Sequence, residues 1–206
     1  MPSRCRLKTL PDLTGPNLSI LFVGINPGLL SAHKGHYYSK KGNHFWPCLA
    51  RSGLVPVHFG PENDTECLEH SVGLTDIVQR CTRAQTEITR DEFDEGAGRL
   101  REKLKRLNPM CVVFNGKQIY ANFRAVRLKD VKCGVQDYQL EGCVSRFYVM
   151  TNSSALNAHF PTADSRMFYY EEIKSLVGKL KKSPYFQAVK EQENFPETKL
   201  AIDSFI

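Results

Sequence analysis

Long apolar runs are absent from this sequence of 206 residues. No stretch approaches the roughly 20 consecutive apolar residues that a membrane-spanning helix needs. The first residues, Met1-Pro2-Ser3-Arg4, do not lead into the hydrophobic segment of a secretory signal. These two absences predict a protein with no membrane partner, placed in the nucleus if the organism is eukaryotic and otherwise in the cytoplasm.

Closely spaced cysteine pairs are missing as well. The seven cysteines are odd in number, and no two of them stand in a Cys-x-x-Cys arrangement. That arrangement is typical of zinc and iron–sulfur sites, and cysteines in a reducing compartment stay as thiols. We therefore expect no disulfide framework, no metal and no other cofactor.

Glycine-rich phosphate loops do not occur either. Neither G-x-G-x-x-G nor the P-loop pattern is found, which disfavours an ordinary nucleotide-binding enzyme. What the chain does have is a net charge of +6. Such a charge favours an anionic partner, but by itself it raises the likelihood that this partner is nucleic acid only modestly.

Apolar periodicity predicts one domain in which strands and helices alternate, because a single core can bury most of the apolar surface at this length. We expect strands at residues 18–23, 72–78, 111–114 and 147–150, and helices at 44–52, 89–107, 118–123 and 165–181. This order predicts an α/β fold, a three-layer αβα sandwich around a mostly parallel sheet. The domain should span residues 1–182, followed by a partly ordered polar tail over 183–206.

The helix at residues 89–107 has the clearest signals, since Thr89 and Glu92 form a capping box and Asn108-Pro109 ends the pattern. Two regions are less regular: 56–71 is polar and aperiodic, and 131–142 resembles a hairpin. The second strand should pass into a loop around Thr75 and Asp76. On the last helix the positions expected to face inward are Phe168, Ile173, Leu176 and Leu180.

The loops after residues 23, 72, 114 and 150 should gather at one edge of the sheet, where parallel α/β folds place their sites. The first of them, Gly24-Ile25-Asn26-Pro27-Gly28, is a tight turn that presents one short amide side chain. Asn26 is therefore the candidate catalytic group.

Four ordered motifs, GINPG, GNHFW at 42–46, FNGK at 114–117 and NSSAL at 152–156, resemble those of the mismatch-specific uracil/thymine DNA glycosylases. The resemblance extends from about residue 18 to residue 181. It implies the uracil-DNA glycosylase fold and hydrolysis of the bond between a flipped pyrimidine and deoxyribose.

The reaction passes through an oxocarbenium-like sugar, so water must be placed on one face while the departing base anion is stabilised. The Asn26 amide is neutral and cannot act as a strong base, but its carbonyl can accept a hydrogen bond from water and aim it. By resemblance, Thr82 helps to hold that water, and backbone amides after Asn26 donate to the base. No lysine occupies the nucleophile's place, so no lyase step is expected.

The resemblance also implies a pocket for the flipped base. Its expected members are Ile25, Ser31, Tyr37, Tyr38 and Asp76. Tyr38 matches the aromatic residue that stacks on the base, the alternative being ordinary loop packing. Tyr37 and Ser31 differ from the histidine and alanine of the vertebrate thymine enzymes, which favours uracil over thymine as the substrate.

Contacts to DNA are implied at two further motifs and just beyond the second. The expected residues are Asn115, Lys117, Asn152, Ser153, Ser154, Leu156, Ala158 and His159. Leu156 corresponds to the wedge that fills the vacated base stack. Relatives have leucine or arginine at this position, and leucine resembles the bacterial type. Ala158 and His159 match positions near the opposite guanine, and the remaining five match positions that contact the phosphate backbone.

Asp76 departs from the family, which usually offers an amide or a lysine at this position. An ionised carboxylate accepts the N3 proton of uracil but repels the anionic leaving base. Three possibilities stay open: Asp76 is protonated, it is solvated, or it selects bases that carry an exocyclic amine.

The sequence thus predicts a monomeric, monofunctional glycosylase of base excision repair. Its partner is double-stranded DNA with a flipped-out pyrimidine opposite guanine, above all uracil and then thymine or other modified pyrimidines. The alternative is a catalytically weak protein that binds mismatches or lesions.

Overall fold

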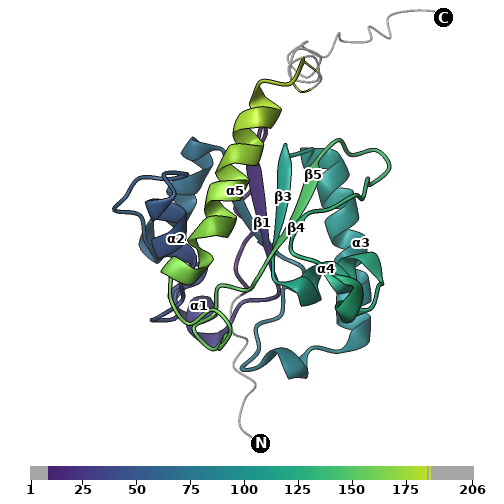
Figure 1. Ribbon diagram of the computed structural model, residues 1–206. Helices are drawn as coiled ribbons and strands as arrows, with labels where there is room; N and C mark the ends of the chain where they lie inside the picture. The colour runs from purple at the N-terminus through teal and green to yellow at the C-terminus, as the bar shows by residue number, and fades with distance from the viewer. Residues whose placement is uncertain (1–8, 185, 187–206) are drawn as a thin grey trace, which may run out of the picture.

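A computed structural model describes residues 9–184 and residue 186 (Figure 1). Most of the expected tail, residues 183–206, lies outside the described part, so that expectation and the domain boundary at residue 182 stay predictions. Within the described residues, no helix has both the length and the apolar character needed to cross a membrane.

A five-stranded sheet forms the centre, in the order β2-β1-β3-β5-β4. The strands are β1 (Ile20–Gly24), β2 (Val72–Asp76), β3 (Cys111–Asn115), β4 (Gly134–Val135) and β5 (Arg146–Met150). β1, β2, β3 and β5 pair in parallel, and only β4 pairs antiparallel, with β5. The sheet is therefore mostly parallel, as the sequence predicts.

Helices cover both faces of the sheet, which confirms the predicted layers (Figure 1). One face carries α2 (Phe45–Arg51) and α5 (Asp164–Lys181), and the other carries α3 (Arg90–Leu107) and α4 (Lys117–Arg124). Alternate side chains of each strand point to opposite faces, so Phe22 packs toward α2 and α5 while Val23 packs toward α3 and α4. The two resulting cores hold the strand ends in fixed positions.

The carboxyl ends of the four parallel strands lie at one edge, beside α1 (Leu29–Lys34) in Figure 1. Short 3₁₀ segments lie between the main elements: η1 (Pro61–His70), η2 (Gln85–Glu87) and η3 (Leu128–Asp130). Neither α1 nor η1 was expected, because both are short and lack a long apolar stripe. The loops that carry the motifs leave the sheet at this edge.

Three local predictions were wrong. Thr75 and Asp76 belong to β2 and not to a loop, because both pair with β1. Phe168 is 48% exposed, whereas its neighbours Tyr169 and Tyr170 are buried; Ile173 and Leu180 are buried as expected. Residues 131–142 contribute only the short strand β4, which pairs with β5 and forms no hairpin of its own.

The predicted capping box of α3 is present. Glu92 N donates to Thr89 Oγ1 over 3.2 Å, and Thr89 N donates to Glu92 Oε2 over 2.9 Å. The helix ends at Asn108, whose backbone is left-handed with φ 44°. The first turn of α3, which contains the capping box, lies near the site described below.

α3 approaches the chain after β2 very closely at Gly96. A Cβ built there would lie 2.1 Å from the backbone oxygen of Ile77, whereas one built at Gly98 meets nothing within 4 Å. We expect Gly96→Ala to lower the free energy of unfolding by about 2 kcal/mol or more, because the helix must move away from the sheet. Gly98→Ala should raise it by about 0.5–1 kcal/mol, as alanine stabilises helix interiors. Urea unfolding measures the free energy of unfolding of both variants. Equal changes in the two variants would contradict the close packing at Gly96.

Candidate functional site

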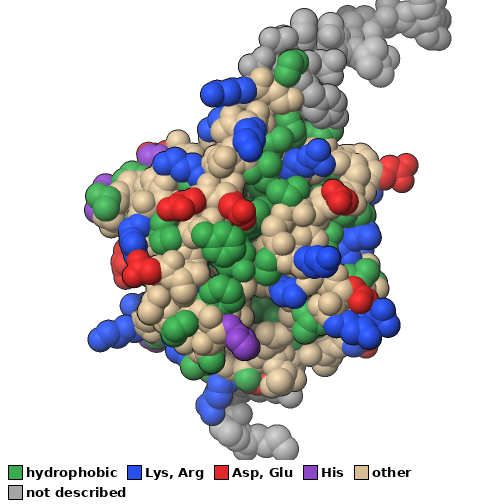
Figure 2. Space-filling view, viewed as in Figure 1, with side chains coloured by type: hydrophobic (Ala, Val, Ile, Leu, Met, Phe, Trp, Pro, Cys, Tyr) green, Lys and Arg blue, Asp and Glu red, His purple; other side chains and the backbone are tan. Residues whose placement is uncertain are grey.

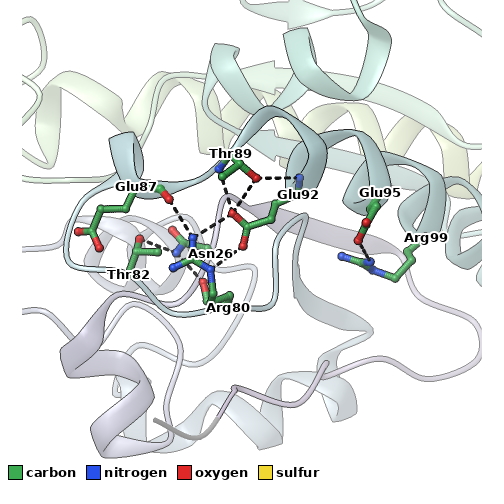
Figure 3. Close-up of polar contacts among 8 residues, drawn as sticks. All are labelled: Asn26, Arg80, Thr82, Glu87, Thr89, Glu92, Glu95 and Arg99. Carbon is green, nitrogen blue, oxygen red and sulfur yellow. Dashed lines mark hydrogen bonds and ion pairs between the residues drawn. The ribbon is translucent and has the colours of Figure 1, made fainter. Parts of the chain in front are cut away.

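The amide of Asn26 is held in one orientation by two acceptors. Asn26 Nδ2 donates to the backbone oxygen of Arg80 and to Thr82 Oγ1, each over 2.8 Å (Figure 3). A carbonyl oxygen can only accept, which fixes which end of the amide carries the nitrogen. Asn26 Oδ1 has no hydrogen-bond partner among the described residues and is left to accept from a solvent molecule.

The expected partner, Thr82, lies beside this amide. Its side chain is buried, and its backbone nitrogen donates to the oxygen of Pro27 over 3.3 Å. Val78 N likewise donates to the oxygen of Ile25 over 2.9 Å, so the chain after β2 runs alongside the GINPG turn. Because Thr82 Oγ1 accepts from Asn26, its own proton is available to a neighbouring group.

Tyr38 lies on the other side of the turn, over the position where Gly24 lacks a side chain. Its ring stacks on Phe45 with centroids 4.0 Å apart, and its hydroxyl is buried without a hydrogen-bond partner. A Cβ on Gly24 would lie 3.0 Å from that hydroxyl and 2.1 Å from Asp76 Oδ1. The absent side chain therefore leaves room beside Gly24 for both the hydroxyl and the carboxyl.

The backbone of Tyr38 has a φ of 54°, a strained value for a tyrosine. The loop is held in this shape by neighbours on both sides. Buried Asp64 accepts from Tyr37 N over 2.9 Å and lies 3.1 Å from His36 Nδ1, and Ser31 Oγ accepts from Ser39 N over 3.1 Å.

Three expected pocket residues have their side chains directed into the protein. Tyr37 is buried and donates through its hydroxyl to the oxygen of Pro11 over 3.3 Å. Ile25 packs against the core on the α3 side of the sheet, and Ser31 is buried. In this structure all three side chains therefore contact the protein interior.

Asp76 is buried at the end of β2, and a cavity of about 70 Å³ adjoins it between β2 and α3. Burial raises the pKa of its carboxyl to about 8; the negative charge of Asp12 acts in the same direction and Lys103 in the opposite one. The pKa of Tyr38 is also raised, first by burial and then by Asp76. At neutral pH both groups are protonated, which favours the first of the three possibilities for Asp76. A neutral carboxyl offers one donor and one acceptor, as an amide does.

Asn115 and Ser153 are buried and bind each other. Asn115 Nδ2 donates to Ser153 Oγ over 2.9 Å, and Ser153 N donates to Asn115 Oδ1 over 2.9 Å. Both side chains are thus already paired within the protein, and they join the end of β3 to the loop after β5. This geometry assigns them the positioning of that loop.

Arg166 lies fully buried beneath the same loop. Its guanidinium donates to the backbone oxygens of Ser154 over 2.8 Å, Thr162 over 2.9 Å and Asn152 over 3.3 Å. Its partners are carbonyl groups, and no carboxylate of the described chain pairs with it. The loop therefore has a fixed positive charge behind it.

The tip of the loop is open to solvent. The side chain of Leu156 is 80% exposed, and Ala158 and His159 are also exposed. Ser154 Oγ accepts from Leu156 N over 3.2 Å, and Asn152 Oδ1 accepts from Ser154 N over 3.2 Å. Half-buried Lys117 begins α4 directly after Gly116, which lies close to Asn152. Apart from buried Ser153, the residues of this loop are thus accessible to a macromolecule.

Basic side chains do not form a single patch on the face seen in Figure 2. Lysines and arginines are spread among acidic residues there, and hydrophobic side chains gather over α5. The positive charges on this face are therefore mixed with negative ones.

Sequence reasoning gave no site role to several residues that the structure brings into the site. Arg166 supports the loop from α5, Asp64 supports the loop of Tyr38, and Arg80 holds Asn26 through a backbone atom that no motif encodes. His44 lies inside the GNHFW motif, so the sequence did indicate that it belongs near the site. Its Nε2 is buried without a partner, and burial followed by the charge of Arg166 lowers its pKa.

Residues 11–174 match the sequence profile of a family described as the uracil DNA glycosylase superfamily. Among solved structures, the chain is similar to the solution NMR structure of a candidate uracil DNA glycosylase from Methanosarcina acetivorans. The TM-score is 0.56 at 21% sequence identity, over 82% of this chain and 98% of the other. At that identity the structural likeness shows the shared α/β fold.

Proposed function

Because this chain belongs to the uracil DNA glycosylase superfamily, we propose that it is a monofunctional glycosylase of the mismatch-specific uracil/thymine type. It flips uracil opposite guanine out of duplex DNA and hydrolyses the bond to deoxyribose. The observation that carries the proposal is the amide of Asn26, held by Arg80 and Thr82 with its oxygen unpaired.

In the proposed reaction Asn26 Oδ1 accepts a hydrogen bond from water and directs its oxygen at the anomeric carbon. Both Nδ2 bonds prevent the amide from turning over, so the acceptor is present before the substrate binds. Thr82 Oγ1 donates its remaining proton to the same water. The glycosidic bond breaks with the electron pair leaving on the base as an anion. The water oxygen bonds to the sugar and its proton passes to bulk solvent, from which the released base anion takes up a proton.

The flipped uracil stacks on the face of Tyr38 that Phe45 does not cover. Protonated Asp76 reads the base edge: its carbonyl oxygen accepts the N3 proton and its hydroxyl donates to a carbonyl of the base. A neutral carboxyl also avoids repulsion of the base anion. This arrangement supports uracil as the main substrate.

Leu156 fills the space that the base leaves in the duplex, where an apolar side chain buries no unpaired polar group. Asn152, Ser154 and Lys117 bind the phosphates next to it, and Ala158 and His159 lie toward the opposite guanine. Asn115 and Ser153 keep this loop in register with the sheet. The protein acts as a monomer and, in a eukaryote, in the nucleus.

The test is incubation of the protein with duplexes that carry guanine opposite uracil, thymine or ethenocytosine, followed by alkaline cleavage of abasic sites. We expect cleavage at uracil to exceed that at thymine, and no strand breakage before alkali because no lyase step occurs. Tight binding of mismatches without abasic product would select the alternative of a lesion-binding protein. No product and no selective binding would overturn both.

A further inference from the structure

The segment that holds the Asn26 amide is itself fixed by a side chain pointing toward α3. The segment runs beside the GINPG turn, through Val78 N to the oxygen of Ile25 and Thr82 N to the oxygen of Pro27. Arg80 lies between these two contacts and supplies the backbone oxygen to which Asn26 donates. Any shift of Arg80 therefore changes the direction of the catalytic amide.

The guanidinium of Arg80 binds the first turn of α3 in a forked arrangement (Figure 3). Arg80 Nε donates to Glu92 Oε1 over 2.5 Å, and Nη2 donates to Glu92 Oε2 over 2.9 Å and to the backbone oxygen of Glu87 over 2.8 Å. Paired bonds of this kind fix direction as well as distance. The side chain of Arg80 has three bonds to the protein and links η2 to α3.

Glu92 is rigid because it also caps the helix. Its Oε2 accepts from Thr89 N over 2.9 Å and from Thr89 Oγ1 over 3.1 Å. The bond from Arg80 lowers the pKa of Glu92 to about 2, and the Thr89 backbone contributes in the same direction. The carboxylate is charged at any pH at which the enzyme would work, and α3 anchors it to the sheet.

An ordinary surface ion pair lies one turn further along α3 and shows the difference. Arg99 Nη1 contacts Glu95 Oε2 once, over 3.4 Å, with side chains 51% and 72% exposed. The Arg80 and Glu92 side chains are 49% and 26% exposed and meet at two atoms each. Solvent-exposed ion pairs add little to stability. The Arg80–Glu92 pair is therefore more important for the position of Arg80 than for the free energy of unfolding.

We propose that the Arg80–Glu92 pair positions the catalytic amide: it holds the Arg80 carbonyl and the Thr82 hydroxyl against Asn26 and so keeps Asn26 Oδ1 aimed at the reacting carbon. Neither residue touches the substrate, and both act through Asn26. The inference rests on the proposed glycosylase function.

The first measurement is the single-turnover rate of uracil excision with enzyme in excess, together with the dissociation constant for an abasic duplex. Glu92→Gln keeps an oxygen for the helix cap but loses the charge and one half of the fork. We expect it to slow excision by between about tenfold and a hundredfold, because displacement of a positioning group by about 1 Å has effects of this size. Arg80→Lys, which keeps the charge without the fork, should also be slow. Glu95→Gln and Arg99→Gln, the matched controls, should be unchanged, as should DNA affinity in all four variants.

The second measurement is hydrogen exchange of the Asn26 side-chain amide by NMR in the free protein, with the signal assigned from its loss in Asn26→Ala. Glu92→Gln and Arg80→Lys should speed this exchange, and the two controls should not. If wild-type protein removes no uracil, the proposed function fails while this exchange still decides the positioning role. Unchanged exchange in Glu92→Gln, or an unchanged excision rate in an active enzyme, overturns the proposal.

Discussion

An Asn26→Ala variant should remove uracil from a guanine mispair about a thousandfold more slowly than the wild-type protein, while binding the same duplex with unchanged affinity. The reason is that Asn26 Oδ1 is the unpaired acceptor held in place by Arg80 and Thr82, and loss of a preorganised group that acts on the reacting atoms costs rates of this order. Single-turnover excision at saturating enzyme measures the effect. Alanine removes the acceptor without adding charge or bulk.

Two further variants make the Asn26 result specific. Thr82→Val keeps the shape of Thr82 but removes the hydroxyl that accepts from Asn26 Nδ2, and we expect an intermediate loss. Asn63→Ala removes an asparagine whose side chain binds only Gly60 and Glu66, at the start of η1, and excision should be unchanged. A wild-type rate in Asn26→Ala would show that water is positioned by another group.

The second large effect is expected at Asp76 and depends on pH. Its carboxyl has a pKa raised to about 8, so wild-type excision of uracil should fall as pH rises through this value and the donor to the base edge is lost. Asp76→Asn keeps a donor at every pH. It should equal the wild type near pH 6.5 and exceed it by about tenfold at pH 9, where about one carboxyl in ten keeps its proton.

The same ionisation should appear in the stability of the protein. The folded state holds a proton on Asp76 up to about pH 8, whereas the unfolded chain releases it near pH 4. Between these values the folded state binds more protons, so its free energy of unfolding falls as pH rises, by on the order of 4 kcal/mol at pH 7 relative to pH 4. Asp76→Asn should lack this slope in thermal unfolding. Asp137→Asn, at an exposed aspartate, serves as the control and should match the wild type. Parallel pH profiles of the Asp76→Asn variant and the wild type, in both rate and stability, would contradict a protonated Asp76.

Two charged groups act on the pKa of Asp76 besides its burial. Asp12, in the segment before β1, raises it, and Lys103, on α3, lowers it. Asp12 and Lys103 are also paired with each other, so burial outweighs both of them in setting the pKa.

The strands and the longer helices could be predicted because local sequence determines them. A continuous apolar run ends at Gly24, and the Thr89–Glu92 capping box marks the start of α3. On α5, Ile173 and Leu180 are buried as expected, but the inward residue near its start could not be predicted. Phe168, Tyr169 and Tyr170 are all apolar enough to be buried, and only packing in the core decides among them.

The candidate site was predictable as far as its residues belong to motifs or match the family that the sequence resembles. Asn26 and Thr82 were expected to act together, and the structure places them 2.8 Å apart. The support of Asn26 by Arg80 depends on a backbone oxygen, so the identity of the side chain at position 80 carries no signal for it. Asn115 shows the converse, because its motif indicated a contact with DNA and the structure pairs it internally with Ser153.

In the proposed reaction the loop that carries Leu156 parts stacked bases, and the bases exert an equal force on the loop. Arg166 of α5 donates hydrogen bonds to the backbone oxygens of Asn152, Ser154 and Thr162 in the same loop. The three bonds connect the residues before and after the tip to one helix. A force on the tip is therefore resisted by α5 as well as by the loop itself. Because these bonds go to backbone oxygens, they do not depend on which side chain stands at position 156. Residues of different shape can therefore occupy position 156 without any change to the support beneath them.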